Sequence, residues 1–533
     1  MHRTVLIGLD GATWNVLDAY MAEGVMPFLR RFIAEGARAD LKSTPNPLTP
    51  PAWTSMITGR TPGHHGIFDF VRSQESERGL YFTLNTSQDV RCETLWSMID
   101  RQGGSITSLN FPVTFPPPKV RGYVVPGFVS WKHMRRAVHP PEFYNAIQAL
   151  AGFDVKEVAM DVNEELRTIQ YLPDDQYEGW IAQHTRREGQ WLGIVRQVLT
   201  ETPTDLVAVL FDGVDKLQHL CWRFIDPALA PAAPTPFESK VIGLCRAYFR
   251  TVDACVEEVV RLAGKDARVF IASDHGFTAT HDVFYANVWL EREGLLGWTE
   301  AAVRDDSGKS AAARIKSHVV GIDWNKTTAY ALTPSSNGIF IRRPGRPGHP
   351  GVAGEAYDNL RRRITDRLMA LRHPRTGEPF VRKVMTREEA FPGPESERAP
   401  DLTLVLHDYG FLSVLNGADV IWPRPIPAGT HRPEGIFAAR GPGIARGALL
   451  AQANIVDVAP AILHSLGLPV PADLEGRAVD GCFDPAFLAA APIRVEGTTR
   501  SPSGAAAAAA AATAVEDEDE EVMARLRALR YIE

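Results

Sequence analysis

Continuous apolar runs constrain the fold of this chain more than any other feature of its sequence. Each run is rich in Val, Ile and Leu, lacks the polar alternation of a half-exposed strand and is flanked by turn residues, which is typical of strands buried in a parallel sheet. The runs are TVLIGL (4–9), DLVAVLF (205–211), ARVFIAS (267–273) and DLTLVLH (401–407), with GIFAARG (435–441) as a further candidate. Between two runs, apolar residues recur at three- and four-residue steps over residues 238–263, which predicts a helix. The alternation predicts an α/β protein with a mostly parallel sheet flanked by helices.

The size and charge of the chain narrow its class. Its 533 residues allow one large domain with insertions, or several ordinary domains. Apolar residues make up 45% and charged residues 23%, which predicts a mostly globular chain. The net charge of −7 comes partly from one acidic run, EDEDEE, so nothing in the folded body indicates a nucleic-acid surface.

The N-terminus and the cysteines indicate a compartment. The first apolar run, residues 5–9, is too short for a signal peptide, and no stretch approaches the roughly 20 apolar residues of a membrane span. The chain has 5 cysteines, an odd number without a CxxC pair, which favours a reducing environment over a disulfide framework. We therefore expect a soluble cytoplasmic protein that does not associate with membranes.

Two longer segments interrupt the pattern of strands and helices. Residues from about 71 to 200 include the proline-rich PVTFPPPKV, and residues from about 283 to 400 include the basic RRPGRPGHPG. We interpret both as insertions that cap a site and select its substrate. Residues 493–521 read as a low-complexity linker with an alanine-rich stretch and the acidic run, and residues 522–533 predict a short amphipathic C-terminal helix.

Acidic residues follow three of the predicted strands. Asp10 ends the first, Asp212 follows the second, and the pair Asp274-His275 ends the third. Ligands of open α/β sheets bind beyond the carboxyl ends of the strands, so polar residues there often carry function. Each position alone has a structural alternative: an Asx turn at Asp10, and a helix start at Asp274.

A helix and a loop offer further candidates. In VLFDGVDKLQHL, Asp215 and His219 are four residues apart, which places them on one face of a helix and within reach of one metal ion. The alternative is a helix start capped by Asp212 with a half-buried His219. His431, in AGTHRPEGIF, precedes an apolar run, and a lone loop histidine usually has no function.

The combination of these residues indicates a two-metal site. Such a site needs several Asp and His ligands for a borderline metal such as zinc, and two ions about 4 Å apart clamp the oxygens of an in-line phosphoryl displacement. The chain supplies, with one hydroxyl ligand still needed, Asp10, Asp215, His219, Asp274, His275 and His431.

These motifs, taken in order, resemble the type I phosphodiesterase/nucleotide pyrophosphatase family of the alkaline phosphatase superfamily. The matching segments are LIGLDG, LTPPAWTSMITGRTPGHHGI, DKLQH, SDHGF, GTHRPEGIF and the closing IVDVAPAILHSLGLPVPADLEGRAV, which together span residues 4–479. The resemblance implies an alkaline-phosphatase-like core over residues 1–492, a mostly parallel sheet flanked by helices with inserted cap segments.

The resemblance also implies roles for individual residues. The family's nucleophilic Thr stands nine residues before the Thr of the TG pair, here Thr58, which selects Thr49. A Thr at a loop-to-helix junction gains the positive end of the helix, and Pro50 and Pro51 favour its first turn. One metal ion is then expected on Asp10, Thr49, Asp274 and His275, and the other on Asp215, His219 and His431. The ions are expected to be zinc, with manganese or iron as alternatives. Asp212 is expected to support the metal ligands or to cap the helix that follows it, rather than to bind a metal.

The expected reaction is hydrolysis of a small-molecule phosphoester through a phosphothreonine intermediate. The alternatives are a phosphomutase or phosphomonoesterase on the same scaffold, or a catalytically silent binding protein; none of the cysteines lies in the CxPxR signature of a sulfatase.

The chain departs from the family beside the nucleophile motif. The nucleotide pyrophosphatases place an Asn just after HGI to bind a phosphate oxygen, whereas this chain has Phe68, Asp69 and Phe70. Asn110 or Asp69 are the candidates to replace that amide, and a nucleotide substrate is in question. His64 and His65 are expected to belong to the turn rather than to the metal site.

Overall fold

Half of the strands in the described part of the chain form one large sheet. The computed structural model describes residues 3–76, 79–160, 172–300, 302, 321–344 and 351–500. Within them, a 9-stranded sheet has the order β17-β2-β16-β8-β1-β7-β5-β6, and β18 also pairs with β2. Its strands are β1 (Thr4–Leu9), β2 (Ala37–Lys42), β5 (Ile106–Leu109), β6 (Gly122–Val125), β7 (Leu206–Phe211), β8 (Arg268–Ala272), β16 (Glu434–Arg440), β17 (Ala448–Leu449) and β18 (Ala453–Asn454). Strand β16 runs antiparallel to β2 and β8, whereas the other pairs are parallel, which confirms the predicted mostly parallel sheet.

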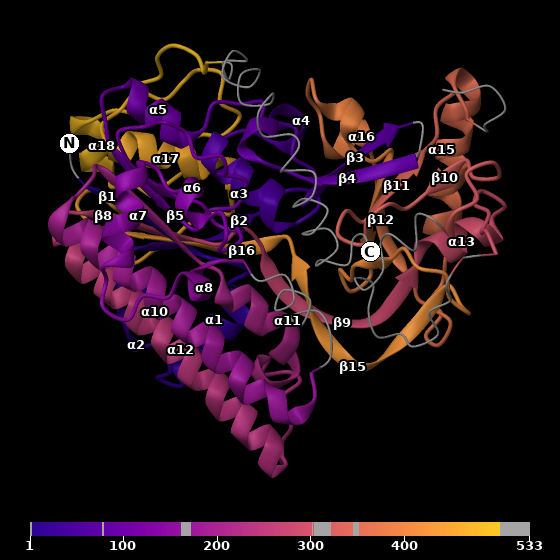
Figure 1. Cartoon of the computed structure of the whole chain (residues 1–533), viewed down its shortest axis with the longest axis horizontal. Helices are drawn as coiled ribbons and strands as arrows, with labels where there is room; N and C mark the ends of the chain where they lie inside the picture. Colours follow the sequence, from indigo (N-terminus) through magenta and orange to yellow (C-terminus); the bar gives the residue numbers. More distant parts are fainter. Residues whose placement is uncertain are drawn as a thin grey trace.

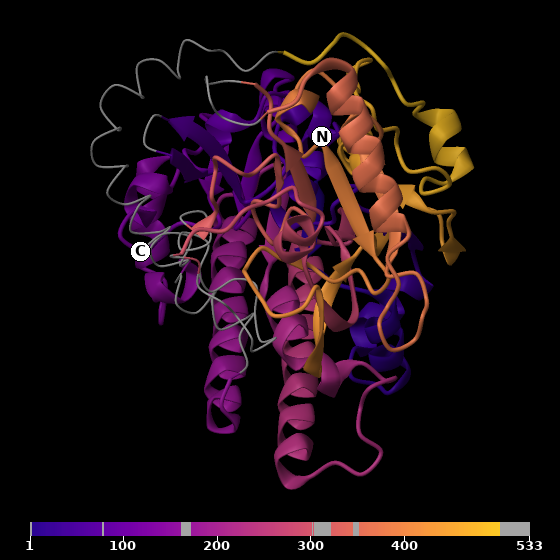
Figure 2. The ribbon, with the colours of Figure 1, turned by 90° about the vertical axis from the view of Figure 1, so that its right-hand side faces the viewer.

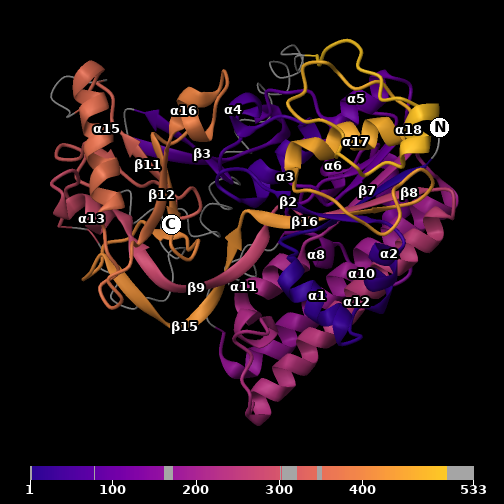
Figure 3. The same ribbon diagram turned by 180° about the vertical axis from the view of Figure 1, so that it is seen from behind.

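Helices cover both faces of the large sheet (Figures 1 and 3). Alternate side chains of β1 belong to different apolar clusters, Val5 and Ile7 to one and Leu6 to the other, as a strand buried on both faces requires. The first face packs against α1 (Trp14–Ala22), α2 (Pro27–Ala34), α10 (Tyr177–Glu201), α11 (Gly213–Ile225) and α12 (Pro236–Ala263), and the second against α3 (Thr49–Thr58), α5 (Leu95–Arg101) and α17 (Val458–Ser465). Helix α12 contains the predicted helix, and Thr235 and Glu238 form a capping box at its start.

A smaller body lies beside the large sheet, at the right of Figure 1. It contains an antiparallel sheet of order β10-β11-β13-β12. Its elements are β10 (Ala329–Tyr330), β11 (Gly338–Ile341), β12 (Val381–Thr386), β13 (Leu402–Leu406), α13 (Ala286–Arg292) and α15 (Gly354–Met369). Their side chains share one apolar cluster, so this body has its own core.

Two strand pairs join the bodies (Figures 1 and 2). The long strands β9 (Gly276–Tyr285) and β15 (Ile421–Arg432) pair antiparallel and form a ribbon, which β14 (Leu412–Ser413) extends. The hairpin of β3 (Val71–Ser76) and β4 (Gly79–Leu84) reaches the smaller body, where Val71 and Phe82 pack with Leu332. Shorter helices are α4 (Pro62–His65), α6 (Met134–Ala137), α7 (Pro141–Gln148), α8 (Val155–Val158), α16 (Arg387–Ala390) and α18 (Pro485–Ala490).

Residues 401–407 do not form a parallel strand of the large sheet, so that prediction is wrong. Strand β13 belongs to the smaller sheet and pairs antiparallel with β11 and β12. Leu402, Leu404 and Leu406 lie in the core of the smaller body. A continuous apolar run indicates burial and carries no information about the direction of the neighbouring strands. The run at residues 435–441 is a second example, because β16, which contains most of it, pairs antiparallel with β2 and β8.

The predicted insertions at 71–200 and 283–400 stay predictions. Within the first range, β5 and β6 are strands of the large sheet and α10 packs against it; within the second lie most elements of the smaller body. The linker from residue 501 and the predicted helix at 522–533 fall outside the described residues. Among the described residues, no helix combines the length and apolar character of a membrane span.

Candidate active site

The ends of two adjacent strands and the start of one helix bring four predicted residues together. Strands β1 and β8 are parallel neighbours, so Asp10 and the pair Asp274-His275 emerge at the same edge of the sheet. His275 Nε2 lies 3.2 Å from Asp274 Oδ2, 3.7 Å from Asp10 Oδ1 and 3.5 Å from Oγ1 of Thr49, the first residue of α3. These four residues, which we name the inner group, are at most 4% exposed.

Helix α11 and the ribbon supply three further residues, which we name the outer group. Asp215 and His219 lie one turn apart on α11, and His431 lies on β15 opposite Phe277 of β9. Asp215 Oδ1 is 3.1 Å from His431 Nε2 and 3.5 Å from His219 Nε2. The side chains of Asp215 and His219 are 16% and 11% exposed, so this group lies nearer to solvent than the inner group.

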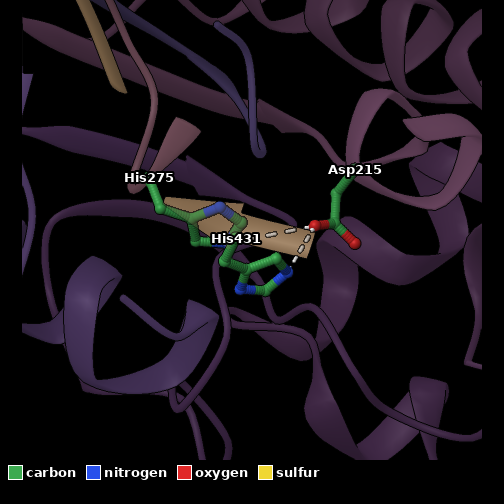
Figure 4. A group of neighbouring side chains, drawn as sticks. All are labelled: Asp215, His275 and His431. Carbon is green, nitrogen blue, oxygen red and sulfur yellow. Dashed lines mark ion pairs between the residues drawn. The ribbon is translucent and has the colours of Figure 1, made fainter. Parts of the chain in front are cut away.

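The two groups are in direct contact. Asp215 Oδ1 lies 3.9 Å from His275 Nε2, and the rings of His275 and His431 stack with centroids 3.6 Å apart. Figure 4 shows the carboxylate of Asp215 to one side of the two stacked imidazoles, facing a nitrogen of each. The structure therefore brings together all the residues that the sequence selected as metal ligands, from positions between 10 and 431 of the chain.

The three histidines direct Nδ1 to a backbone carbonyl and Nε2 to the centre of the site. Nδ1 of His219, His275 and His431 lies 3.2, 3.2 and 2.8 Å from the carbonyl oxygens of Gly429, Gly276 and Pro47. A carbonyl only accepts, so we assign the proton of each neutral ring to Nδ1 and a lone pair to Nε2.

Two of these lone pairs face each other. Nε2 of His219 and Nε2 of His431 are 2.9 Å apart. Burial lowers the pKa of His219 to about 4 and that of His275 well below its usual value, so both rings are neutral near pH 7. Such an arrangement is repulsive by itself and is favourable around a cation.

Carboxylate oxygens without hydrogen bonds complete the site. Asp10 Oδ1 and Asp274 Oδ2 are buried and accept no hydrogen bond. Burial raises the pKa of Asp274 to about 7, and burial together with the charge of Asp274 raises that of Asp10 well above its usual value. Uncompensated buried carboxylates are costly, and a divalent cation would supply the missing charge. These donors fit a metal ion.

Among the described residues, three clusters have metal-ligand spacing, and the third differs from the other two. Asp215, His275 and His431 form one, and Asp10, Asp274 and His275 form another. The third combines His407 with Asp282 of the ribbon and Asp408, two carboxylates that already have partners. Asp282 lies 3.1 Å from His373 and 3.2 Å from Arg375, and Asp408 accepts from Thr280 Oγ1 at 2.9 Å and from the N–H of His281 at 2.7 Å.

The sequence profile of the type I phosphodiesterase/nucleotide pyrophosphatase family matches residues 4–431. The chain belongs to this family.

Two solved structures illustrate the remote similarity of this chain to known proteins. An inactive variant of murine ectonucleotide pyrophosphatase/phosphodiesterase 5 in complex with AMP is 13% identical in sequence, with a TM-score of 0.50. The match covers 88% of this chain and 96% of the murine chain. Phosphonoacetate hydrolase from Sinorhizobium meliloti 1021 in complex with phosphonoformate is 18% identical, covers 87% and 95%, and has a TM-score of 0.48. A search of curated proteins finds no match. At these identities, the similarity to the murine enzyme establishes the alkaline-phosphatase-like fold.

Both candidates to replace the family's phosphate-binding amide have hydrogen-bond partners within the protein. Asn110 is fully buried, and its Nδ2 donates to the carbonyl of Leu210 at 2.9 Å. Asp69 accepts hydrogen bonds from Thr333 and Ser335 of the smaller body. The position after Asp69 is Phe70, whose ring lies 6.2 Å from that of Phe128.

The start of α3 offers few donors to a phosphate. The helix begins at Thr49 with Pro50 and Pro51 in its first turn, as the sequence predicts. The prolines have no N–H, and the N–H of Ala52 donates to the carbonyl of Leu48 at 3.0 Å. Of the first turn, only the N–H of Thr49 remains for an anion.

His64 and His65 lie at the end of the short helix α4, which follows α3, and not in the metal-ligand cluster. His65 Nδ1 accepts from the N–H of Ile67 at 3.2 Å, and its Nε2 lies 2.9 Å from Ser55 Oγ. His64 Nδ1 lies 3.0 Å from Glu475.

A buried ionic network that the sequence did not reveal holds the start of α11. Arg187 of α10 donates to both carboxylate oxygens of Asp212, at 2.8 and 3.0 Å. The next residue, Glu188, accepts from the N–H of Gly213 at 2.9 Å and from Tyr248 at 2.7 Å. Asp212 thus supports the helix that carries Asp215 and His219, in line with its expected role. The sequence signal that could have revealed this network is the charged pair Arg187-Glu188 within the buried, mostly apolar stripe of residues 177–201.

Proposed function

We propose that this chain is a metal-dependent phosphoester hydrolase with Thr49 as nucleophile and two divalent cations, one on the inner group and one on the outer group. The observation that carries this proposal is the convergence of buried carboxylate oxygens and imidazole lone pairs at the carboxyl edge of the sheet, beside the Thr49 hydroxyl. Membership of a phosphodiesterase and pyrophosphatase family supports the reaction class.

The donor set favours zinc, because mixed imidazole and carboxylate ligands suit it; manganese and iron are the alternatives. When bound, the cations would stabilise charge on the phosphoryl group and make the hydroxyl and water stronger nucleophiles at neutral pH. Backbone carbonyls of Gly429, Gly276 and Pro47 fix the imidazoles, so the ligand set is oriented before a substrate arrives.

The reaction proceeds in two displacements at phosphorus. Thr49 loses its hydroxyl proton, Oγ1 forms a new P–O bond, and the bond from phosphorus to the leaving oxygen breaks, so that the alcohol departs with a proton. Water then attacks the phosphothreonine, the bond to Oγ1 breaks, and the hydroxyl is restored. Because the outer group is the more exposed, we expect the leaving group and the water to use that side.

A phosphoester panel tests this proposal. Protein reconstituted with zinc or manganese is assayed on p-nitrophenyl phosphate, bis-p-nitrophenyl phosphate, nucleotides and a phosphosugar pair, which also separates a diesterase from a monoesterase or mutase. We expect turnover of a diester, and Thr49→Ala should remove it while the protein keeps its metal. Thr54→Ala is the matched control, because this buried hydroxyl on the same helix has no hydrogen-bond partner. Full turnover by Thr49→Ala, with metal bound, would overturn the assignment.

A further inference from the structure

Asp69 joins the nucleophile motif to the smaller body. Its side chain is 6% exposed and accepts hydrogen bonds from Thr333 Oγ1 at 2.5 Å and Ser335 Oγ at 2.8 Å. The N–H of Phe70 donates to the same carboxylate at 2.6 Å. Thr333 and Ser335 lie more than 260 residues further along the chain than Asp69, so their hydrogen bonds form a contact between two bodies and not a local turn.

The same loop is held from a second side, close to Thr49. Asn46 is 3% exposed, and its Nδ2 donates to the carbonyl of Ser335 at 2.9 Å. Asn46 precedes Pro47, whose carbonyl accepts from His431 Nδ1 at 2.8 Å. Loop residues 333–335 are therefore hydrogen-bonded both to Asp69 and to Asn46, in the segment that precedes Thr49.

The loop continues to a second segment that touches a candidate metal ligand. Asn337 Oδ1 accepts from the N–H of Leu412 at 3.0 Å, and its Nδ2 donates to the carbonyl of Gly410 at 3.3 Å. The ring of Phe411, between them, lies edge-on to His431 with centroids 5.0 Å apart.

Each of these two segments contains one non-glycine residue with a left-handed backbone conformation. Asn337 and Tyr409 have φ of 46° and 62°, in the left-handed region that disfavours side chains larger than glycine. The hydrogen bonds of Asn337, and that from Thr430 Oγ1 to the carbonyl of Tyr409 at 3.2 Å, hold the pair of loops in place.

We infer that Asp69 is a positioning residue that holds residues 333–337 and, through them, residues 409–411 beside the outer group. These two segments, which we name the wall, contact the substituent that leaves the phosphoester. The inference rests on the proposed function. It also explains why a carboxylate follows HGI in this chain: Asp69 accepts hydroxyls from the smaller body instead of serving a phosphate oxygen. Phe411 is half-buried, so the wall presents an apolar face, which suits an aryl leaving group better than a charged one.

Steady-state kinetics on bis-p-nitrophenyl phosphate test the inference with metal-loaded protein. Asp69→Ala should raise KM about tenfold, because the loop that contacts the substrate loses its two hydroxyl bonds to Asp69, and should leave kcat within about twofold, because the candidate ligands stand on other elements. Thr333→Val combined with Ser335→Ala should give the same KM from the other side of the contact. Asp69→Asn should restore most of the affinity, since an amide can accept from one hydroxyl and donate to the other.

A control and a second readout separate this role from simple stabilisation. Thr328→Val removes a hydroxyl of the smaller body that donates to the carbonyl of Leu295, away from Asp69, and should leave KM unchanged. Amide hydrogen exchange over residues 331–337 should speed up in Asp69→Ala and not over residues 213–219. A fall in kcat at unchanged KM, or unchanged exchange, would overturn the inference.

Failure of the proposed function has a different signature. In that case the metal-loaded wild type would hydrolyse no phosphoester, while the exchange experiment would still report whether Asp69 holds the loop. If Asp69→Ala does not fold, the double variant of Thr333 and Ser335 carries both measurements.

Discussion

The inner and outer groups offer similar donors on very different supports. The inner group stands at the ends of β1 and β8, whose backbones are hydrogen-bonded on both sides within the large sheet, and at the start of α3. The outer group stands on α11, which a buried ionic network anchors, and on the ribbon that leads to the smaller body. Strands with partners on both sides thus carry most of the inner group, whereas a helix anchored by side-chain contacts and a ribbon outside the large sheet carry the outer group. Distant substitutions should therefore disturb the outer group before the inner group.

Replacing an inner ligand should have the largest effect. Asp274→Asn keeps the shape and removes the charge of a fully buried carboxylate, so we expect turnover to fall at least about 10⁴-fold, or about 5 kcal/mol of transition-state stabilisation. Asp266→Asn, an exposed position before the other end of β8, is the control and should stay within about twofold. Turnover of Asp274→Asn within tenfold of wild type would remove this residue from the chemistry.

The anchor of the outer group should come next. Arg187→Met leaves Asp212 buried without its bidentate partner, and we expect the free energy of unfolding to fall by about 4 kcal/mol. Arg196→Met on the same helix breaks an exposed pair with Glu258 and should cost less than about 1 kcal/mol. Urea unfolding measures both.

The same variant should separate the two groups. Elemental analysis of Arg187→Met should show loss of the outer ion before the inner one, because Asp212 lies at the start of the helix that carries Asp215 and His219. Equal loss from both groups would contradict the division between backbone and side-chain support.

Asp69 should make the stability of the contact between the bodies pH-dependent. Burial raises the pKa of Asp69 to about 6, above its value near 3.8 in an unfolded chain, so ionisation in the folded state is unfavourable. The resulting penalty is absent below pH 4, grows as pH rises to 6 and is then constant. Relative to wild type, Asp69→Asn should gain up to about 3 kcal/mol between pH 4 and 7. Urea midpoints across this range measure the difference, and parallel curves for the two proteins would refute the prediction.

Replacing an outer ligand should have the smallest effect of these. His219→Ala leaves Asp215 and His431 in place at the more exposed end of the site, and we expect turnover to fall about 100-fold and to recover in part with excess metal. His281→Ala, exposed on the ribbon, is the matched control. A loss as large as that of Asp274→Asn, without recovery in metal, would erase the distinction between the groups.

The sequence predicts the inner half of the site better than the outer half. Asp10 and Asp274 each follow a buried apolar run, so once these runs are parallel strands of one sheet both residues lie at its carboxyl edge. The spacing of Asp215 and His219 predicts one helix face, but His431 reaches them through the pairing of β15 with β9, which no local pattern specifies.

The supports of the site escape sequence reasoning for a physical reason. The bond between Asp69 and Thr333 spans 264 residues, and Arg187 meets Asp212 only because α10 packs across α11. The direction of β13 was missed because Leu402, Leu404 and Leu406 reveal burial, whereas pairing depends on β11 and β12. Contacts between distant segments are set by the whole fold and leave little trace in any short stretch.

Covalent trapping tests the central claim most directly. Metal-loaded protein is quenched with acid during turnover of a diester, digested and analysed by mass spectrometry for a phosphoryl group. We predict one adduct on Thr49, a phosphoryl group that still carries the second ester substituent of the diester, and none in Thr49→Ala, which should be inactive. A phosphoryl group on Thr54 or Ser55 instead, or undiminished turnover by Thr49→Ala with its metal bound, would contradict the account.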